Sequence, residues 1–203
     1  MKKIVFLSFL IISFISLFGS DNPSSGVGIR FGSFGIPNQL LDMFIYEHPK
    51  VQGSAFSFEV RSYGNKGLKS VFSGVYSFEY SKMSGEGTWR IDQTDRPLVG
   101  SGEMTQFSVC ATILLNMFPS FPVHPYVGAG IGLSKVQIWA EGIYEDEVGT
   151  QIKDSFVTNK IIPVGHIPVG IAINIRDQVE IRLETGFKNG FYFSGGVTYI
   201  FIK

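Results

Sequence analysis

The sequence predicts an all-β protein, an eight-stranded antiparallel transmembrane up-and-down β-barrel. The segment 190–201 alternates aromatic or branched residues with glycine, serine and threonine, a period of two that suits a strand with lipid on one side. Mean hydropathy is positive, yet no helix-length apolar stretch follows the first 20 residues. Only 17% of the residues are charged, below the roughly 25% of typical soluble domains.

The first 20 residues have the pattern of a secretory signal peptide. Lys2 and Lys3 precede an apolar run from Ile4 to Phe18, which is too short for a spanning helix. We therefore expect residues 1–20 to be a signal peptide and residues 21–203 to form one outer membrane β-barrel domain. The lone Cys110 cannot form an intramolecular disulfide, so an exported chain must gain its stability from the closed hydrogen-bonded barrel.

The formal charges exclude a nucleic-acid partner. The chain has 17 basic and 17 acidic residues, and removing the two lysines of the signal leaves 15 basic residues against 17. Nucleic-acid-binding domains carry a basic patch or stripe, and none is present.

The first two predicted strands span residues 27–36 and 54–63. In the first, Val27, Ile29 and Phe31 alternate with small or charged residues, but Phe34 and Ile36 break the phase after Ser33. We expect a β-bulge there, which would return both apolar side chains to the outer face. The second strand alternates phenylalanine and valine with serine, glutamate and arginine, and a glycine- and asparagine-rich turn follows it.

The remaining strands follow the same alternation. Glycines line one side of the fifth, isoleucines and valines line one side of the sixth, and Glu180, Arg182 and Glu184 line one side of the seventh. Prolines after the fourth end its ladder, because proline has no N–H to donate. The predicted ranges are 68–82, 103–118, 125–139, 160–175, 179–187 and 190–201.

Connection lengths predict the topology. Short links are expected at 64–67, 119–124 and 176–178, and long loops at 37–53, 83–102 and 140–159. Short periplasmic turns alternating with long extracellular loops are typical of outer membrane barrels. The last connection, Lys188 to Gly190, is very short for that pattern.

The chain resembles the small eight-stranded outer membrane barrels: the OmpA-like transmembrane domain, OmpX and the opacity-type proteins. The resemblance rests on 125–132 (PYVGAGIG), on 179–184 (VEIRLE) and on the aromatic last strand. It implies a location in the outer membrane, with its lipids and lipopolysaccharide as partners. It also implies that the barrel-assembly machinery reads the terminal strand, here Val197, Tyr199 and Phe201.

Seven charged residues fall on the face predicted to turn inward. An eight-stranded barrel has an interior just wide enough for side chains to fill, and unpaired buried charges are costly. We therefore predict a paired lumenal charge network that plugs the barrel, with a polar path for small solutes as the alternative. The network comprises Arg30, Glu59, Arg61, Glu79, Glu180, Arg182 and Glu184.

No catalytic, cofactor-binding or metal site is predicted. Glu180 and Glu184 would lie about 13 Å apart along a strand, beyond glycosidase spacing. His166 faces inward, but Pro168 occupies the place where a lipid A deacylase of the His–Ser type would carry its serine.

Two of the long loops invite functional readings. The acidic residues of the loop 140–159 lack the spacing of a calcium loop, so a solvated charged loop is expected. The first loop is apolar and would either pack on itself and the mouth of the barrel or meet an extracellular partner. The acidic residues are Glu141, Glu145, Asp146, Glu147 and Asp154, and the apolar ones Leu40, Leu41, Met43, Phe44, Ile45 and Tyr46.

Three functions follow from these patterns. The first is a non-enzymatic outer membrane barrel whose loops serve adhesion, host contact or envelope integrity. The second is a narrow OmpW-like channel for small or hydrophobic solutes. The third is a soluble lipocalin-like barrel with its apolar face inward. Two features disfavour it: the face that would meet water is mostly serine and glycine with few lysines, and long loops alternate with short turns.

Overall fold

The computed structural model describes residues 24–43, 45–64, 66–90, 92–93, 96–145, 149–176 and 178–201. The predicted signal peptide, 1–20, lies outside these residues. No helix in the described ranges is long and apolar enough to cross a membrane. Two short helical turns occur among these residues, α2 (Asn38–Leu41) and η1 (Gly67–Lys69).

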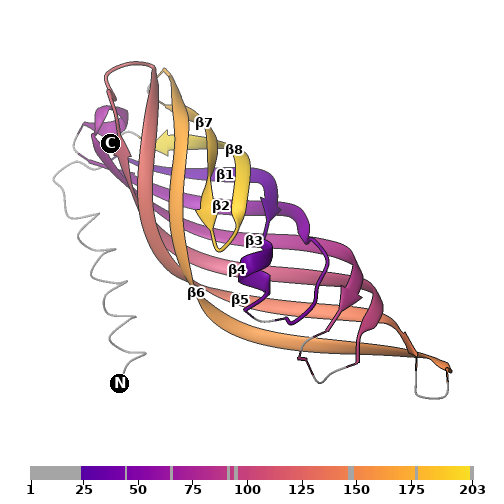
Figure 1. Cartoon of the computed structure of the whole chain (residues 1–203). Coiled ribbons are helices and arrows are strands. Elements are labelled where there is room, and N and C mark those ends of the chain that lie inside the picture. The colour runs from indigo at the N-terminus through magenta and orange to yellow at the C-terminus, as the bar shows by residue number, and fades with distance from the viewer. Residues whose placement is uncertain are drawn as a thin grey trace, which may run out of the picture.

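Eight antiparallel strands close into one barrel in which each strand pairs with its sequence neighbours and β8 returns to β1 (Figure 1). The predicted fold class is therefore confirmed. The strands are β1 (Ser25–Gly35), β2 (Gln52–Tyr63), β3 (Phe72–Trp89), β4 (Leu98–Asn116), β5 (Val123–Glu145), β6 (Gln151–Ile175), β7 (Val179–Lys188) and β8 (Phe191–Phe201).

A ring of exposed apolar side chains surrounds one half of the barrel. Phe31 is 62% exposed, and Ile171 is 47% exposed while its neighbour Ala172 is 1% exposed. Such a continuous apolar surface suits hydrocarbon rather than water, and its inward partners are polar. The soluble lipocalin-like alternative, which needs the apolar face inside, is wrong. We call this ring the apolar belt; it includes Val27, Ile29, Phe31, Phe56, Phe58, Phe78, Tyr80, Phe107, Ile113, Ile131, Leu133, Ile161, Ile167, Val169, Ile171, Leu183, Phe191, Phe193, Val197, Tyr199 and Phe201.

Two of the predicted long loops are mostly strand. β3 continues to Trp89 and pairs there with Leu98, while β5 and β6 pair out to Glu145 and Gln151. β6 has 25 residues, although about 9–11 tilted residues suffice to cross a bilayer. The parts of β3–β6 beyond the apolar belt, residues 82–89, 98–105, 135–145 and 151–160, form what we call the strand extension; it is the tapering end of the molecule in Figure 1.

The pattern of inside and outside reverses where the extension begins. On β3 the outward aromatics give way to Lys82 while the inward position becomes Met83, which is fully buried. On β5 the same change occurs at Lys135 and Val136, the latter 8% exposed. Water outside the extension explains the reversal, because apolar side chains then gain by turning toward the axis. The level at which it occurs marks the upper edge of the hydrocarbon.

The predicted bulge at Ser33 is wrong for the same reason. The pairing of β1 with β2 and β8 runs without interruption through Ser33, and Phe34 points inward at 3% exposure. The apparent slip in phase is the reversal of environment, not an extra residue in the strand.

The interior of the extension is an apolar core. The first loop supplies part of it, since Leu41 and Ile45 are 1% and 2% exposed while Met43 and Tyr46 stay at the surface. The loop therefore packs into the mouth of the barrel, which is one of the two roles expected for it. Phe44 lies outside the described residues. The core comprises Phe34, Leu41, Ile45, Val51, Met83, Trp89, Leu98, Met104, Val136, Ile138, Ala140 and Tyr192.

A pair of charge insertions tests the position of the belt. Ile131 and Val157 are both exposed on the outer face, at 59% and 56%, but only Ile131 lies in the belt. Ile131→Arg is expected to lower the free energy of unfolding by about 2–4 kcal/mol, and Val157→Arg by about 0–1 kcal/mol. Urea unfolding in lipid vesicles measures both. Equal losses would show that no hydrocarbon boundary lies between the two positions.

Candidate functional site in the barrel interior

All seven residues of the predicted network lie inside the barrel. Their side chains come from β1, β2, β3 and β7, at positions whose neighbours along the strand face outward. None is more than 5% exposed. Side chains this deeply buried must find charge partners, because desolvating an unpaired ion costs several kcal/mol.

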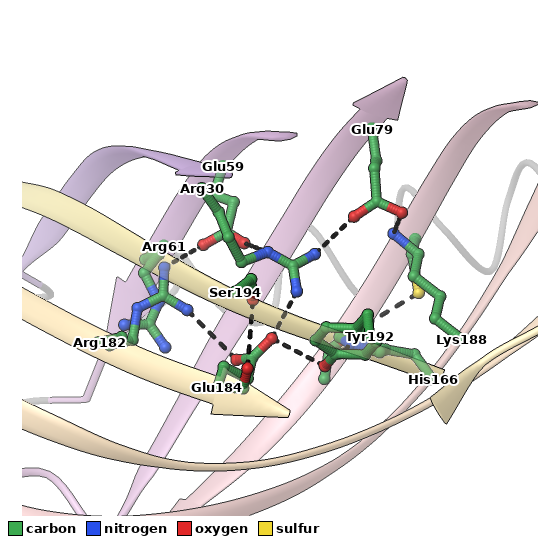
Figure 2. A network of polar contacts seen from close by, with 12 residues as sticks. Arg30, Glu59, Arg61, Glu79, His166, Arg182, Glu184, Lys188, Tyr192 and Ser194 are labelled. Carbon is green, nitrogen blue, oxygen red and sulfur yellow. Dashed lines mark hydrogen bonds and ion pairs between the residues drawn. The ribbon is translucent and has the colours of Figure 1, made fainter. Parts of the chain in front are cut away.

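Arg30 on β1 is the centre of the network (Figure 2). Its guanidinium reaches three carboxylates from three other strands: Nη1 lies 2.5 Å from Glu184, Nη2 lies 2.7 Å from Glu79, and Nε lies 3.0 Å from Glu59. A planar guanidinium presents five donors in a fixed fork, against three on a lysine ammonium, so it suits a position between several carboxylates.

Arg61 and Arg182 complete the network toward the short-turn end. Arg182 Nη2 binds Glu59, and its Nε and Nη1 lie 3.3 Å and 3.5 Å from Glu180 and Glu184. Arg61 Nη1 binds Glu180. Glu180 and Glu184 thus share Arg182, and each is also paired with a second arginine, Arg61 or Arg30, an arrangement that is structural rather than that of an acid–base pair.

Lys188 also belongs to the network, although the sequence predicted it to lie in the last connection. It is the last residue of β7, it is fully buried, and its Nζ lies 3.2 Å from Glu79 Oε1. With Lys188 the four buried carboxylates face four cations, whereas the predicted seven would leave one negative charge in excess. The sequence pattern does indicate this position, because Lys188 continues the even-numbered inward series of Glu180, Arg182 and Glu184.

Neutral polar groups extend the network on one side. Thr112 Oγ1 and Tyr192 Oη each lie 2.8 Å from a ring nitrogen of His166, and Tyr192 donates to Glu184 at 2.8 Å. Since the Tyr192 hydroxyl donates its proton to Glu184, it accepts from His166 Nε2–H, and Nδ1 then accepts from Thr112. Both ring nitrogens are therefore occupied by hydrogen bonds that hold the interior together. This arrangement favours a structural histidine over a catalytic one.

Chemically, the interior is a set of buried ions of opposite sign, each paired with at least one other. Arg30 and Arg182 bridge carboxylates from separate strands, so their side chains cross the lumen at the level of the belt. Within the described residues no group of His, Cys, Asp or Glu has the arrangement of a metal site. The arrangement braces opposite walls of the barrel.

The other residues singled out from sequence lie apart from this network. Val197, Tyr199 and Phe201 are about half exposed on the outer face of β8, beside β1. Two acidic residues of the expected loop, Glu141 and Glu145, are on β5 instead. A third, Asp154, is on β6, while Asp146 and Glu147 lie outside the described residues.

Comparison with known proteins supports the fold. No family model matches the chain, and no curated protein does. Among solved structures, neisserial surface protein A (NspA) is 11% identical with a TM-score of 0.51, over 88% of this chain and 97% of that one. Ail, the attachment invasion locus protein of Yersinia pestis, is 16% identical with a TM-score of 0.49, over 89% and 99%. The fold is that of the small outer membrane β-barrels.

Proposed function

We propose that this chain is a non-enzymatic integral protein of the bacterial outer membrane, exported by its signal peptide and inserted by the barrel-assembly machinery through the strand that carries Val197, Tyr199 and Phe201. The apolar belt contacts the lipids, and lipopolysaccharide surrounds its outer edge. The short turns face the periplasm and the strand extension faces outward. The extension serves adhesion, host contact or envelope integrity.

The observation that carries this proposal is the extension itself. β5 and β6 have 23 and 25 residues and stay paired far beyond the belt. The extension has its own apolar core, which includes Trp89 at 0% exposure. A protein that needed only a membrane anchor would gain nothing from a packed structure of this length, so its outer surface is the working part.

The outer face of the extension carries both signs of charge. Lys82 pairs with Glu103 at 2.7 Å, and Lys153 lies 3.8 Å from Glu141. Mixed exposed charges give solubility and directional contacts rather than attraction to a polyanion. A protein or saccharide surface with neutral polar groups fits this face better than a highly sulfated or phosphorylated chain.

The charge network argues against the alternative of a narrow OmpW-like channel. Its ion pairs link strands on different sides of the lumen, and Arg30 alone holds carboxylates from three strands. A solute would have to separate these pairs in order to pass, leaving charges unpaired in a low-dielectric interior.

Trimming one hairpin tests the proposal. Glu141 pairs with Ser155, so removing 142–154 and joining the ends through an Asn-Gly turn keeps the register and the core residues Ile138 and Ala140. Cells producing the trimmed protein are expected to lose adhesion to host cells or resistance to detergent, at unchanged surface level. Heat-modifiable migration on a gel controls for an intact barrel.

Two results would contradict the proposal. The first is full adhesion and envelope resistance in cells that produce the trimmed protein. The second is stable current steps from the purified wild-type protein in planar bilayers, because a plugged barrel is expected to conduct nothing comparable to a porin measured alongside.

A further inference from the structure

The barrel wall has a gap above the β7–β8 hairpin. Among the described residues, β6 pairs with β7 only from His166 to Ile175, so its outer part, 151–165, has β5 on one side and no strand on the other. β7 and β8 are joined through Asn189 and Gly190 at the top of the belt. In Figure 1 the β7–β8 hairpin ends well short of the far end of β6.

The lower edge of the gap is closed by one side chain. Asn189 Nδ2 donates to the Pro163 carbonyl at 2.7 Å, and the Gly165 N–H donates to Asn189 Oδ1 at 3.4 Å. The amide thus takes the place of the next strand residue. Pro163 has no N–H, so the edge of β6 shows no donor at this residue, a common way to blunt a strand edge.

A cavity of about 420 Å³ passes through this gap. Its lining includes Phe187, which faces outward on β7, together with Met104, Val136 and Ile138, which face inward on β4 and β5. A single space lined by residues from both faces of the wall extends through the gap. Its volume lies in the range of about 300–1,000 Å³ that is usual for ligand sites.

The mouth of the cavity lies at the upper edge of the apolar belt. Ile161 on β6 and Phe191 on β8 flank the gap and are 75% and 66% exposed on the outer face. On β5, Lys135 pairs with Ile161 and is the first charged residue above the belt. The cavity, whose lining is mostly apolar but includes Lys160 and Gln106, therefore opens beside the surface that meets the outer leaflet.

We propose that this opening binds one acyl chain of an outer-leaflet lipid, which enters sideways between β6 and the β7–β8 hairpin. The headgroup stays at the level of Lys135 and the chain lies against Met104, Val136 and Ile138. Methionine side chains are flexible and adapt to chains of different shape. The inference rests on the proposed placement of the belt in a membrane.

Nuclear Overhauser spectroscopy in nanodiscs tests the lipid site and the placement of the apolar belt in a membrane separately. The deuterated protein carries protonated methyl groups and is placed in discs of dimyristoylphosphatidylcholine with protonated chains. Cross-peaks from chain methylenes are expected at Val136 and Ile138, as strong as those at Ile131 in the belt. Leu114, inward-facing and 1% exposed in the lower barrel, is expected to show none.

A cavity-filling substitution provides the second measurement. Ile138→Trp is expected to abolish the lipid cross-peaks at Val136 and Met104, while Val157→Trp, on the outer face of the extension, leaves them unchanged. Cross-peaks at Ile131 without any at Val136 and Ile138 would overturn the lipid site alone. Absence at Ile131 would overturn the membrane placement, and with it the proposed function.

Discussion

Replacing Arg30 with methionine is expected to lower the free energy of unfolding by about 3–5 kcal/mol. Arg30 contacts Glu59, Glu79 and Glu184, all three at most 5% exposed. Methionine fills part of the same space but leaves these carboxylates short of one positive charge. The cost is therefore mainly that of buried, uncompensated negative charge. Urea titration of the protein in lipid vesicles, followed by its fluorescence, measures the change.

Arg90→Met is the matched control. Arg90 also pairs with a glutamate, Glu47 at 3.6 Å, but both side chains are partly exposed. Exposed pairs contribute about 0–1 kcal/mol because water screens them. If Arg30→Met cost no more than Arg90→Met, the network would not brace the barrel, and the plugged interior would lose its main support.

Trp89→Ala is expected to destabilise the strand extension by about 3–5 kcal/mol. Trp89 is fully buried in the extension core. Its ring lies against Gly102, where an added Cβ would come within 2.2 Å of Cζ2, so the two positions fit only as a large and an absent side chain. Alanine leaves a cavity that the paired strands cannot collapse to fill.

The effect is expected to be local. The ionic network holds the barrel at the belt, so Trp89→Ala should open the extension while leaving the belt strands protected. Limited proteolysis in vesicles with mass mapping of the cuts reports this: new cuts are expected within 82–105 and 135–160. The second tryptophan, Trp139, is 36% exposed on the outer face, so Trp139→Ala should change little. Equal sensitivity of both variants would contradict the packed core.

Much of the barrel was predictable because hydrocarbon solvates its outer wall. Where lipid lies outside, apolar and polar residues alternate with a period of two, as at Phe56, Ser57 and Phe58. The eight strands, the inward face of Arg30 and Arg182 and the outward face of Ile171 follow from that alternation. The short turns at 119–124 and 176–178 could be found from their prolines and polar residues.

The extension was missed because its strands lie in water on the outside. The outer face there carries charged residues such as Glu141 and Lys153, which interrupt the outward apolar stripe. A search for that stripe therefore takes the segment for a loop. The same change from lipid to water outside the strand explains the break in alternation at Phe34. A strand's backbone pairing continues across the boundary although its side-chain pattern reverses.

The sequence by itself determined which faces of the strands turn toward lipid, because that choice depends only on each residue's own transfer free energy. It also placed seven of the eight buried charges on the inner face. Only the tertiary structure decided which ions pair, that Lys188 balances the buried negative charge, and that β6 extends beyond the end of β7 and leaves a gap in the barrel wall. Those outcomes depend on register and on strands far apart in the chain, and no local pattern of residues records either.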